Sequence, residues 1–240
     1  MNFYHLASFL ILLPLLSQKA FGQDENTSHK ESLLAWYDQQ VGADQIGLIE
    51  GTYFPIYYTK HESHQFFKDK NWTTGSVVIN GQSYRDVTLM YELFEDVLLM
   101  RHPTNYQYHG QAIKLPSEKI DQFRIHGSLF RNIRNSEIGL KDGFHQVLYE
   151  GATLEVLARR KKIQHIDSEI EYVSEDQWLI VLDSSVINLK NKQSYYKQWP
   201  DWKVDIRKYA REHQLKVNRK HEDDFVKLAI YIDERSRLVQ

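Results

Sequence analysis

The chain has 240 residues, a net charge of −2 and no cysteine. This length is sufficient for one large domain with a sizeable hydrophobic core. The missing cysteine excludes disulfides, a thiolate nucleophile and cysteine-based zinc sites. The charge balance is not basic enough to predict a nucleic-acid partner.

The first residues have the pattern of a secretory signal peptide. An apolar run extends from Leu6 to Leu16, and Ala20-Phe21-Gly22 places small residues at the positions that signal peptidase reads. The run is too short to span about 30 Å of hydrocarbon at about 1.5 Å per residue. We therefore expect a signal peptide over residues 1–22 and no transmembrane segment in the mature chain. A secreted chain without disulfides fits a bacterial envelope, either periplasmic, outer-membrane associated or extracellular.

A polar segment follows over residues 23–46, in which Leu33, Leu34 and Tyr37 would allow a short amphipathic helix. The next run, over residues 47–58, has the composition of a first strand. Within it, Pro55 indicates a sheet edge or a bulge, because proline has no N–H to donate to a neighbouring strand.

The clearest pattern lies between Asn71 and Met100. Asn80-Gly81 predicts a type I′ hairpin turn, in which both central residues need positive φ. After the turn, apolar residues recur at every second position, as on one face of a strand: Val87, Leu89, Tyr91 and Leu93. A second reversal at Glu95-Asp96 predicts three antiparallel strands in total. The stretch holds no nucleophile, metal cluster or phosphate loop, so we interpret it as scaffold.

Short strand-like runs separated by turns continue to residue 190. They cover residues 111–115, 120–125, 128–133, 144–149, 153–162, 169–173, 177–182 and 186–189. From residue 191 the apolar period becomes helical, with Asp201 as the expected N-cap of one helix. The apolar stripe of a second helix comprises Phe225, Leu228, Ala229 and Ile232.

The predicted fold is therefore mainly β. We expect an antiparallel meander over residues 47–190, forming a twisted sheet or a partly closed barrel. A small C-terminal α-helical element over residues 191–240 would pack on that sheet.

Seven motifs occur in a fixed order along the chain. They are GTYFPIY from Gly51, HESHQFF from His61, WTTGSVVINGQSY from Trp72, VTLMYE from Val87, GFHQVLYEG from Gly143, LARRKKI from Leu157 and IRKYAREHQLKV from Ile206. This set resembles a family of secreted, uncharacterised proteins of the Bacteroidota, over nearly the whole mature chain. The resemblance implies a Gram-negative envelope location but no established activity, cofactor or catalytic residue.

Two histidines could contribute to a site. His61 and His64 lie three residues apart with Glu62 between them, and imidazole with carboxylate can bind zinc. The pattern is not the His-Glu-x-x-His of zinc-binding helices, and a loop does not fix the spacing. We therefore predict surface or sheet-edge histidines, with no metal and no cofactor.

The only dense basic run is Arg159-Arg160-Lys161-Lys162. On one alternating strand it would present Arg159 and Lys161 on one face and Arg160 and Lys162 on the other. Such a run could bind an anionic glycan or lipid, or could protect a sheet edge from strand addition. If a site flanks the meander, we expect it in the loop from His61 to Phe67 or at the turn formed by Glu95 and Asp96.

These observations favour a noncatalytic binding or assembly protein of the cell envelope, whose partner is an envelope component. One alternative is a glycan hydrolase that uses a carboxylate pair. Its candidates lie near the aromatic strands: Glu92, Glu95, Asp96, Glu150 and Glu155. A second alternative is a carrier for a small apolar ligand or lipid, which would need an internal cavity.

Overall fold

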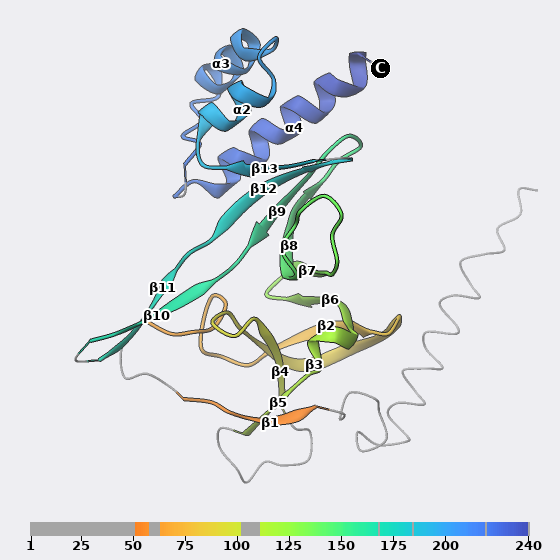
Figure 1. The fold of residues 1–240 in the computed structure, drawn as a ribbon, viewed down its shortest axis with the longest axis vertical. Coiled ribbons are helices and arrows are strands. Elements are labelled where there is room, and N and C mark those ends of the chain that lie inside the picture. Colours follow the sequence, from red (N-terminus) through yellow and green to blue (C-terminus); the bar gives the residue numbers. More distant parts are fainter. Residues whose placement is uncertain are drawn as a thin grey trace, which may run out of the picture. The chain divides into compact units, whose positions relative to one another are not determined.

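A computed structural model describes residues 51–57, 63–101, 111–167, 169–183, 185–218 and 220–239 (Figure 1). The expected signal peptide, the polar segment 23–46 and His61 lie outside these residues. All the described residues belong to one compact unit that begins at Gly47. In this part of the chain, no helix is both long and apolar enough to cross a membrane.

The described strands form an antiparallel sheet of 11 strands that does not close. Its edges are β1 (Thr52–Pro55) and β13 (Ser185–Leu189). From β1 the order continues through β5 (Gln111–Lys114), β4 (Val97–Arg101), β3 (Gln82–Glu92), β2 (Thr73–Ile79), β6 (Ile120–Ile125), β7 (Ser128–Ile133), β8 (Gly143–Glu150), β9 (Glu155–Arg159) and β12 (Gln177–Leu182). A 3₁₀ turn, η3 (Ser117–Lys119), precedes β6. The predicted mainly β fold is confirmed.

The hairpin turn between β2 and β3 has the predicted geometry. Asn80 and Gly81 have φ values of 50° and 78°, both in the region that a type I′ turn requires. Farther along the same pair of strands, Gly75 lies opposite Val87 whereas Val77 lies opposite Tyr84. The strand β3 therefore carries one extra residue, which forms a β-bulge next to β2.

The strand expected over residues 153–162 is broken in the structure. β9 ends at Arg159, and Lys162 begins β10 (Lys162–Ile166), which pairs only with β11 (Ile170–Ser174). At the break, Asp176 accepts hydrogen bonds from the Lys161 backbone N at 3.2 Å and from Arg160 Nη1 at 2.8 Å, and these bonds hold the two residues out of the strand. The simple two-faced alternation expected for the basic run is therefore wrong.

Three helices follow the last strand: α2 (Lys192–Gln198), α3 (Lys203–Glu212) and α4 (Glu222–Val239). The expected N-cap at Asp201 is wrong, since Trp202 occupies that position and makes no side-chain cap bond. The chain first makes a tight turn, in which the Lys203 backbone N donates to the Pro200 carbonyl at 3.2 Å. This turn delays the start of α3 by one residue.

The helices pack on the β12–β13 end of the sheet (Figure 1). The predicted stripe of α4 is fully buried there, and the ring of Phe225 stacks on Trp178 of β12 at 5.6 Å. A second cluster lies inside the curve of the sheet, with ring centroids 4.8 to 5.8 Å apart. Its rings come from β3, β6, β7 and β8 and are buried: Tyr91, Phe123, Phe130 and Phe144.

Candidate functional site

The two segments that flank the meander in sequence meet in the structure. The backbone N of Phe67 donates to the Tyr91 carbonyl at 2.9 Å, and that of Leu93 donates to the Gln65 carbonyl at 2.8 Å. The segment that contains His64 therefore lies beside the end of β3. It is next to the turn that carries Glu95 and Asp96.

The end of the basic run joins the same place. The ammonium of Lys162 donates to the His64 carbonyl, and its backbone N donates to the Leu93 carbonyl at 3.4 Å. Burial lowers the pKa of Lys162, while nearby Asp176 and Glu92 act in the opposite direction. We call this meeting point the turn junction; it comprises His64, Glu92, Asp96, Arg159 and Lys162.

Glu92 is the most buried carboxylate of the turn junction, at 2% exposure. Its two oxygens accept hydrogen bonds from the backbone N–H groups of Phe94, at 3.0 Å, and Glu95, at 2.7 Å. Burial raises the pKa of Glu92 to about 7, although both hydrogen bonds favour the charged form. Glu92 thus holds the turn in shape and titrates near neutral pH.

Asp96 is held from two sides. The hydroxyl of Tyr91 donates to Oδ1 at 2.5 Å, and the backbone N of Phe144 donates to Oδ2 at 3.3 Å. Burial raises the pKa of Asp96, and the nearby charge of Arg159 partly opposes this rise. A Cβ on Gly143 would lie 2.2 Å from Oδ2, so only glycine fits against this carboxylate.

His145 lies next to this group and was not expected from the sequence. It is fully buried, with Nδ1 3.1 Å from the Gly143 carbonyl, and Nε2 has no hydrogen-bond partner among the residues described. Burial lowers the pKa of His145, which favours the neutral ring. The sequence signal that could have identified His145 is the presence of a histidine among the alternating apolar residues of β8.

The other members of the basic run have different surroundings. Arg160 is only 10% exposed and bonds to Gln146 at 2.7 Å, Asp176 at 2.8 Å and Glu222 at 2.6 Å. Lys161 is exposed to solvent. The run is therefore divided among separate environments, and Arg160 connects β8, the start of β12 and the first turn of α4.

The remaining carboxylate candidates are also bonded internally. Arg131 on β7 pairs with Glu150 at 2.9 Å and with Glu155 at 3.0 Å. These two ion pairs hold β7, β8 and β9 in register across one face of the sheet.

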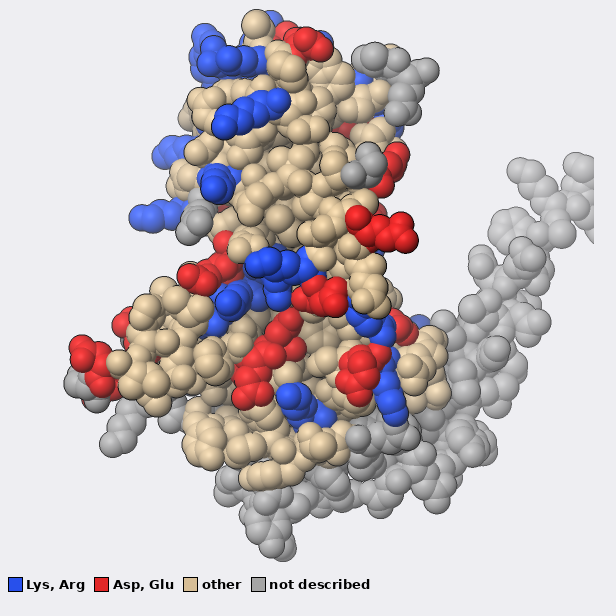
Figure 2. Space-filling view, in the orientation of Figure 1, with Lys and Arg blue, Asp and Glu red and all other residues tan. Residues whose placement is uncertain are grey.

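A cleft of about 680 Å³ opens beside Asp96, and we call it the turn cleft. Its charged lining residues are Glu95, Asp96, Lys114, Glu118, Arg134 and Asp142. Three of these are in ion pairs, since Lys114 pairs with Glu95 at 3.6 Å and Arg134 pairs with Asp121 at 2.9 Å. On the face drawn in Figure 2, charged side chains of both signs gather across the middle of the unit.

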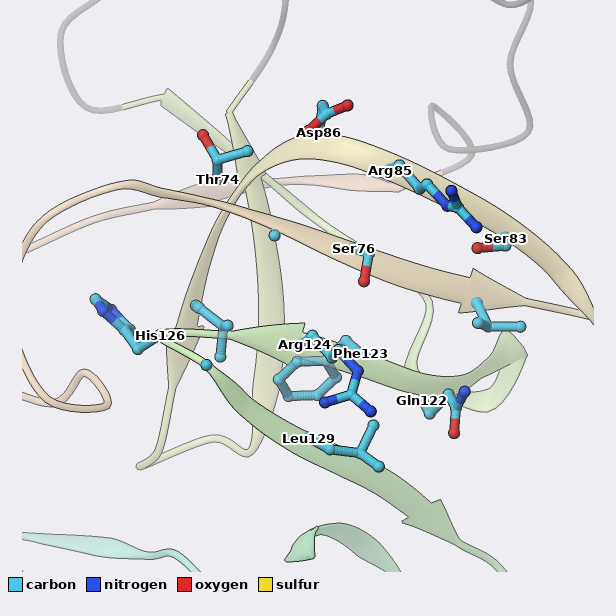
Figure 3. A pocket seen from close by; sticks show the side chains of 14 residues that line it. Thr74, Ser76, Ser83, Arg85, Asp86, Gln122, Phe123, Arg124, His126 and Leu129 are labelled. Carbon is cyan, nitrogen blue, oxygen red and sulfur yellow. The ribbon is translucent and has the colours of Figure 1, made fainter. Parts of the chain in front are cut away.

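A second hollow, of about 510 Å³, lies on the solvent-facing side of β2, β3, β6 and β7 (Figure 3). We call it the strand hollow; the residues that matter most are Ser76, Val78, Ser83, Arg85, Gln122 and Arg124. The sequence pattern of this stretch predicts scaffold and does not predict the hollow. The small side chains that alternate along β2 are a sequence signal for an open surface at this place. The sequence does not show that β2 pairs with β6, and the hollow depends on that pairing.

Among the described residues, no three His, Asp or Glu side chains form a group that could hold a metal ion. Comparison of the chain with protein-family models, curated proteins and solved structures gives no match.

Proposed function

We propose that the protein is a noncatalytic binding or assembly protein of the cell envelope, and that its partner binds in the strand hollow. One observation carries the proposal: the candidate acid, base and basic groups of the turn junction are occupied by bonds that hold the fold. Glu92 caps its own turn, Asp96 accepts from Tyr91, and Lys162 donates to His64. These bonds give each group a role in holding the fold.

The strand hollow differs from the turn junction in its exposure to solvent. Its polar side chains come from strand faces directed to solvent, and Ser83, Arg85, Gln122 and Arg124 are exposed. Exposed polar groups around a concave surface suit reversible binding. The envelope location in this proposal rests on the pattern of residues 1–22 and on the resemblance to secreted proteins of the Bacteroidota.

The hydrolase remains the second candidate, because four carboxylates line the turn cleft: Glu95, Asp96, Glu118 and Asp142. The carrier has less support, since the space inside the curved strands is filled by the buried rings of Tyr91, Phe123, Phe130 and Phe144.

The test is incubation of the full chain with an isolated envelope fraction, followed by mass spectrometry of both retained and released material. We expect a component to be retained chemically unchanged, without time-dependent release of shortened saccharides. Release of such fragments that stops in an Asp96→Asn variant and continues in an Asp121→Asn control would overturn the proposal in favour of the hydrolase.

A further inference from the structure

We propose that the strand hollow binds an acidic saccharide, with Arg85 and Arg124 holding its carboxylate or phosphate group above Ser76. This inference rests on the proposed binding function and names the class of ligand. It is carried by the way three neighbouring strands place one arginine on either side of a serine.

The strand register sets this arrangement. Ser76 on β2 lies directly opposite Arg124 on β6, so both side chains lie on the same face of the sheet. On the other side of β2, Ser76 faces the bulge of β3 between Tyr84 and Val87, which contains Arg85. Neighbouring strands are about 4.8 Å apart, so the backbones of the two arginines lie roughly 10 Å apart, with Ser76 between them. Figure 3 shows Ser76 in this central position.

Arginine is the side chain best suited to this role. Its planar guanidinium can donate two parallel hydrogen bonds to a carboxylate or a phosphate, and it stays charged at any physiological pH. Two such groups on one face, without a bulky side chain between them, can converge on a single anionic group.

A second row of polar groups continues the hollow. Val78 on β2 lies opposite Ser83 on β3 and opposite Gln122 on β6. A hydroxyl and an amide therefore flank the arginine row one step along the strands, where they can bond to sugar hydroxyls. The small side chains of β2 keep the floor open, and about 510 Å³ is within the usual range for small-ligand sites.

The bulge limits the charge that the hollow accepts. Asp86 has φ of 56°, a left-handed conformation that is unfavourable for a residue with a side chain, and it lines the same hollow. With Asp86 opposing Arg85 and Arg124, the local balance favours one anionic group rather than a polyanion. The carboxylate of Asp86 can accept hydrogen bonds from sugar hydroxyls.

The experiment is calorimetric titration of the full chain at low ionic strength with three probes: trigalacturonate, mannose 6-phosphate and neutral maltotriose. We expect binding of at least one acidic probe, and affinity for maltotriose at least about tenfold weaker. The two acidic probes show whether a carboxylate or a phosphate is preferred. Equal affinity for all three, or binding of none, overturns the inference.

Variants locate the site. Arg124→Gln should weaken binding of the acidic probe by at least about tenfold, because a charge-assisted pair is lost, and the Arg85→Gln/Arg124→Gln double variant should abolish it. Arg101→Gln, an exposed arginine at the end of β4, is the matched control and should bind like the unaltered chain. Unchanged affinity in a double variant that unfolds at the same temperature as the unaltered chain overturns the inference.

The outcome can be separated from that of the proposed function. If no acidic probe binds but an envelope component is still retained unchanged, the choice of ligand is wrong and the binding function stands. If no envelope component is retained but an acidic probe binds in the hollow, the partner is a free saccharide rather than an envelope component.

Discussion

The carboxylate of Asp233, in α4, accepts a hydrogen bond of 2.9 Å from the hydroxyl of Tyr149, which lies 84 residues earlier at the end of β8. The same carboxylate accepts from the backbone N of Ala152 at 3.2 Å, and from both the backbone N and the hydroxyl of Thr153 at 2.7 Å. Asp233 is completely buried. This one side chain therefore fixes the last helix to the turn between β8 and β9.

Replacement of Asp233 by alanine should destabilise the protein strongly. It would remove the buried acceptor of Tyr149, Ala152 and Thr153, and hydrogen bonds to charged groups are each worth about 1.5 to 3 kcal/mol. We expect the free energy of unfolding in urea to fall by roughly 3 kcal/mol or more. The adjacent, exposed Glu234→Ala is the control and should change it by less than about 0.5 kcal/mol.

Asp233 should also make the free energy of unfolding depend on pH in the acidic range. Its hydrogen bonds lower its pKa from 3.8 to about 2, so the folded protein holds the ionised form. The resulting stabilisation, about 2 kcal/mol, is complete above the unfolded pKa and is lost as the pH falls through the folded value. Urea unfolding between pH 2 and pH 5 should show this loss in the unaltered chain. An Asp233→Asn variant that keeps the same acid dependence would contradict the assignment.

Glu92 should have the opposite effect at higher pH. Burial raises its pKa from 4.5 to about 7, so the folded state binds the proton more tightly than the unfolded state. Its contribution is therefore complete below about pH 4.5 and is lost as the pH rises to about 7, by roughly 3 kcal/mol. Glu92→Gln should remove this decline from the pH profile of the free energy of unfolding, whereas exposed Glu95→Gln should retain it. Parallel profiles for Glu92→Gln and the unaltered chain would show that Glu92 does not titrate in this range.

Gly75→Ala should disturb the pairing of β2 with β6. A Cβ at this position would lie 2.3 Å from the backbone carbonyl oxygen of Arg124, which cannot rotate away as a side chain could. Such crowding costs about 1 to 3 kcal/mol, so the midpoint of urea unfolding should fall. Ser76→Ala, the next residue, adds no atoms and is the control. An unchanged midpoint in Gly75→Ala would mean that β2 and β6 are too far apart at this point for a Cβ to meet the Arg124 carbonyl oxygen.

Much of the sheet could be predicted because its signals are local. The Asn80-Gly81 turn and the strand that follows it depend on residues next to each other, and both were confirmed. The expected alternation along that strand was wrong, since Leu89, Met90, Tyr91 and Glu92 are all buried. The break after Arg159 could not be predicted in this way. It depends on Asp176, which reaches Arg160 and Lys161 from 15 or more residues away.

The candidate site was likewise predictable only where its signals are local in the sequence. The sequence indicated that His64, Glu95 and Asp96 flank the meander, but Lys162, which joins His64, lies 98 residues farther along the chain. The strand hollow could not be predicted because it depends on the pairing of Ser76 with Arg124. Hydrophobic periodicity shows which face of a strand is buried, and it does not show which strands become neighbours.

The most direct test of the binding function is to fill the strand hollow and measure retention of the envelope component. Ser76→Trp places a large side chain between Arg85 and Arg124 on a strand, where aromatic residues are well tolerated. Asn188→Trp, on the exposed edge strand β13, is the matched control. We predict that Ser76→Trp loses retention, while Asn188→Trp and the unaltered chain keep it. Full retention by a folded Ser76→Trp variant would contradict the claim that the partner binds in the strand hollow.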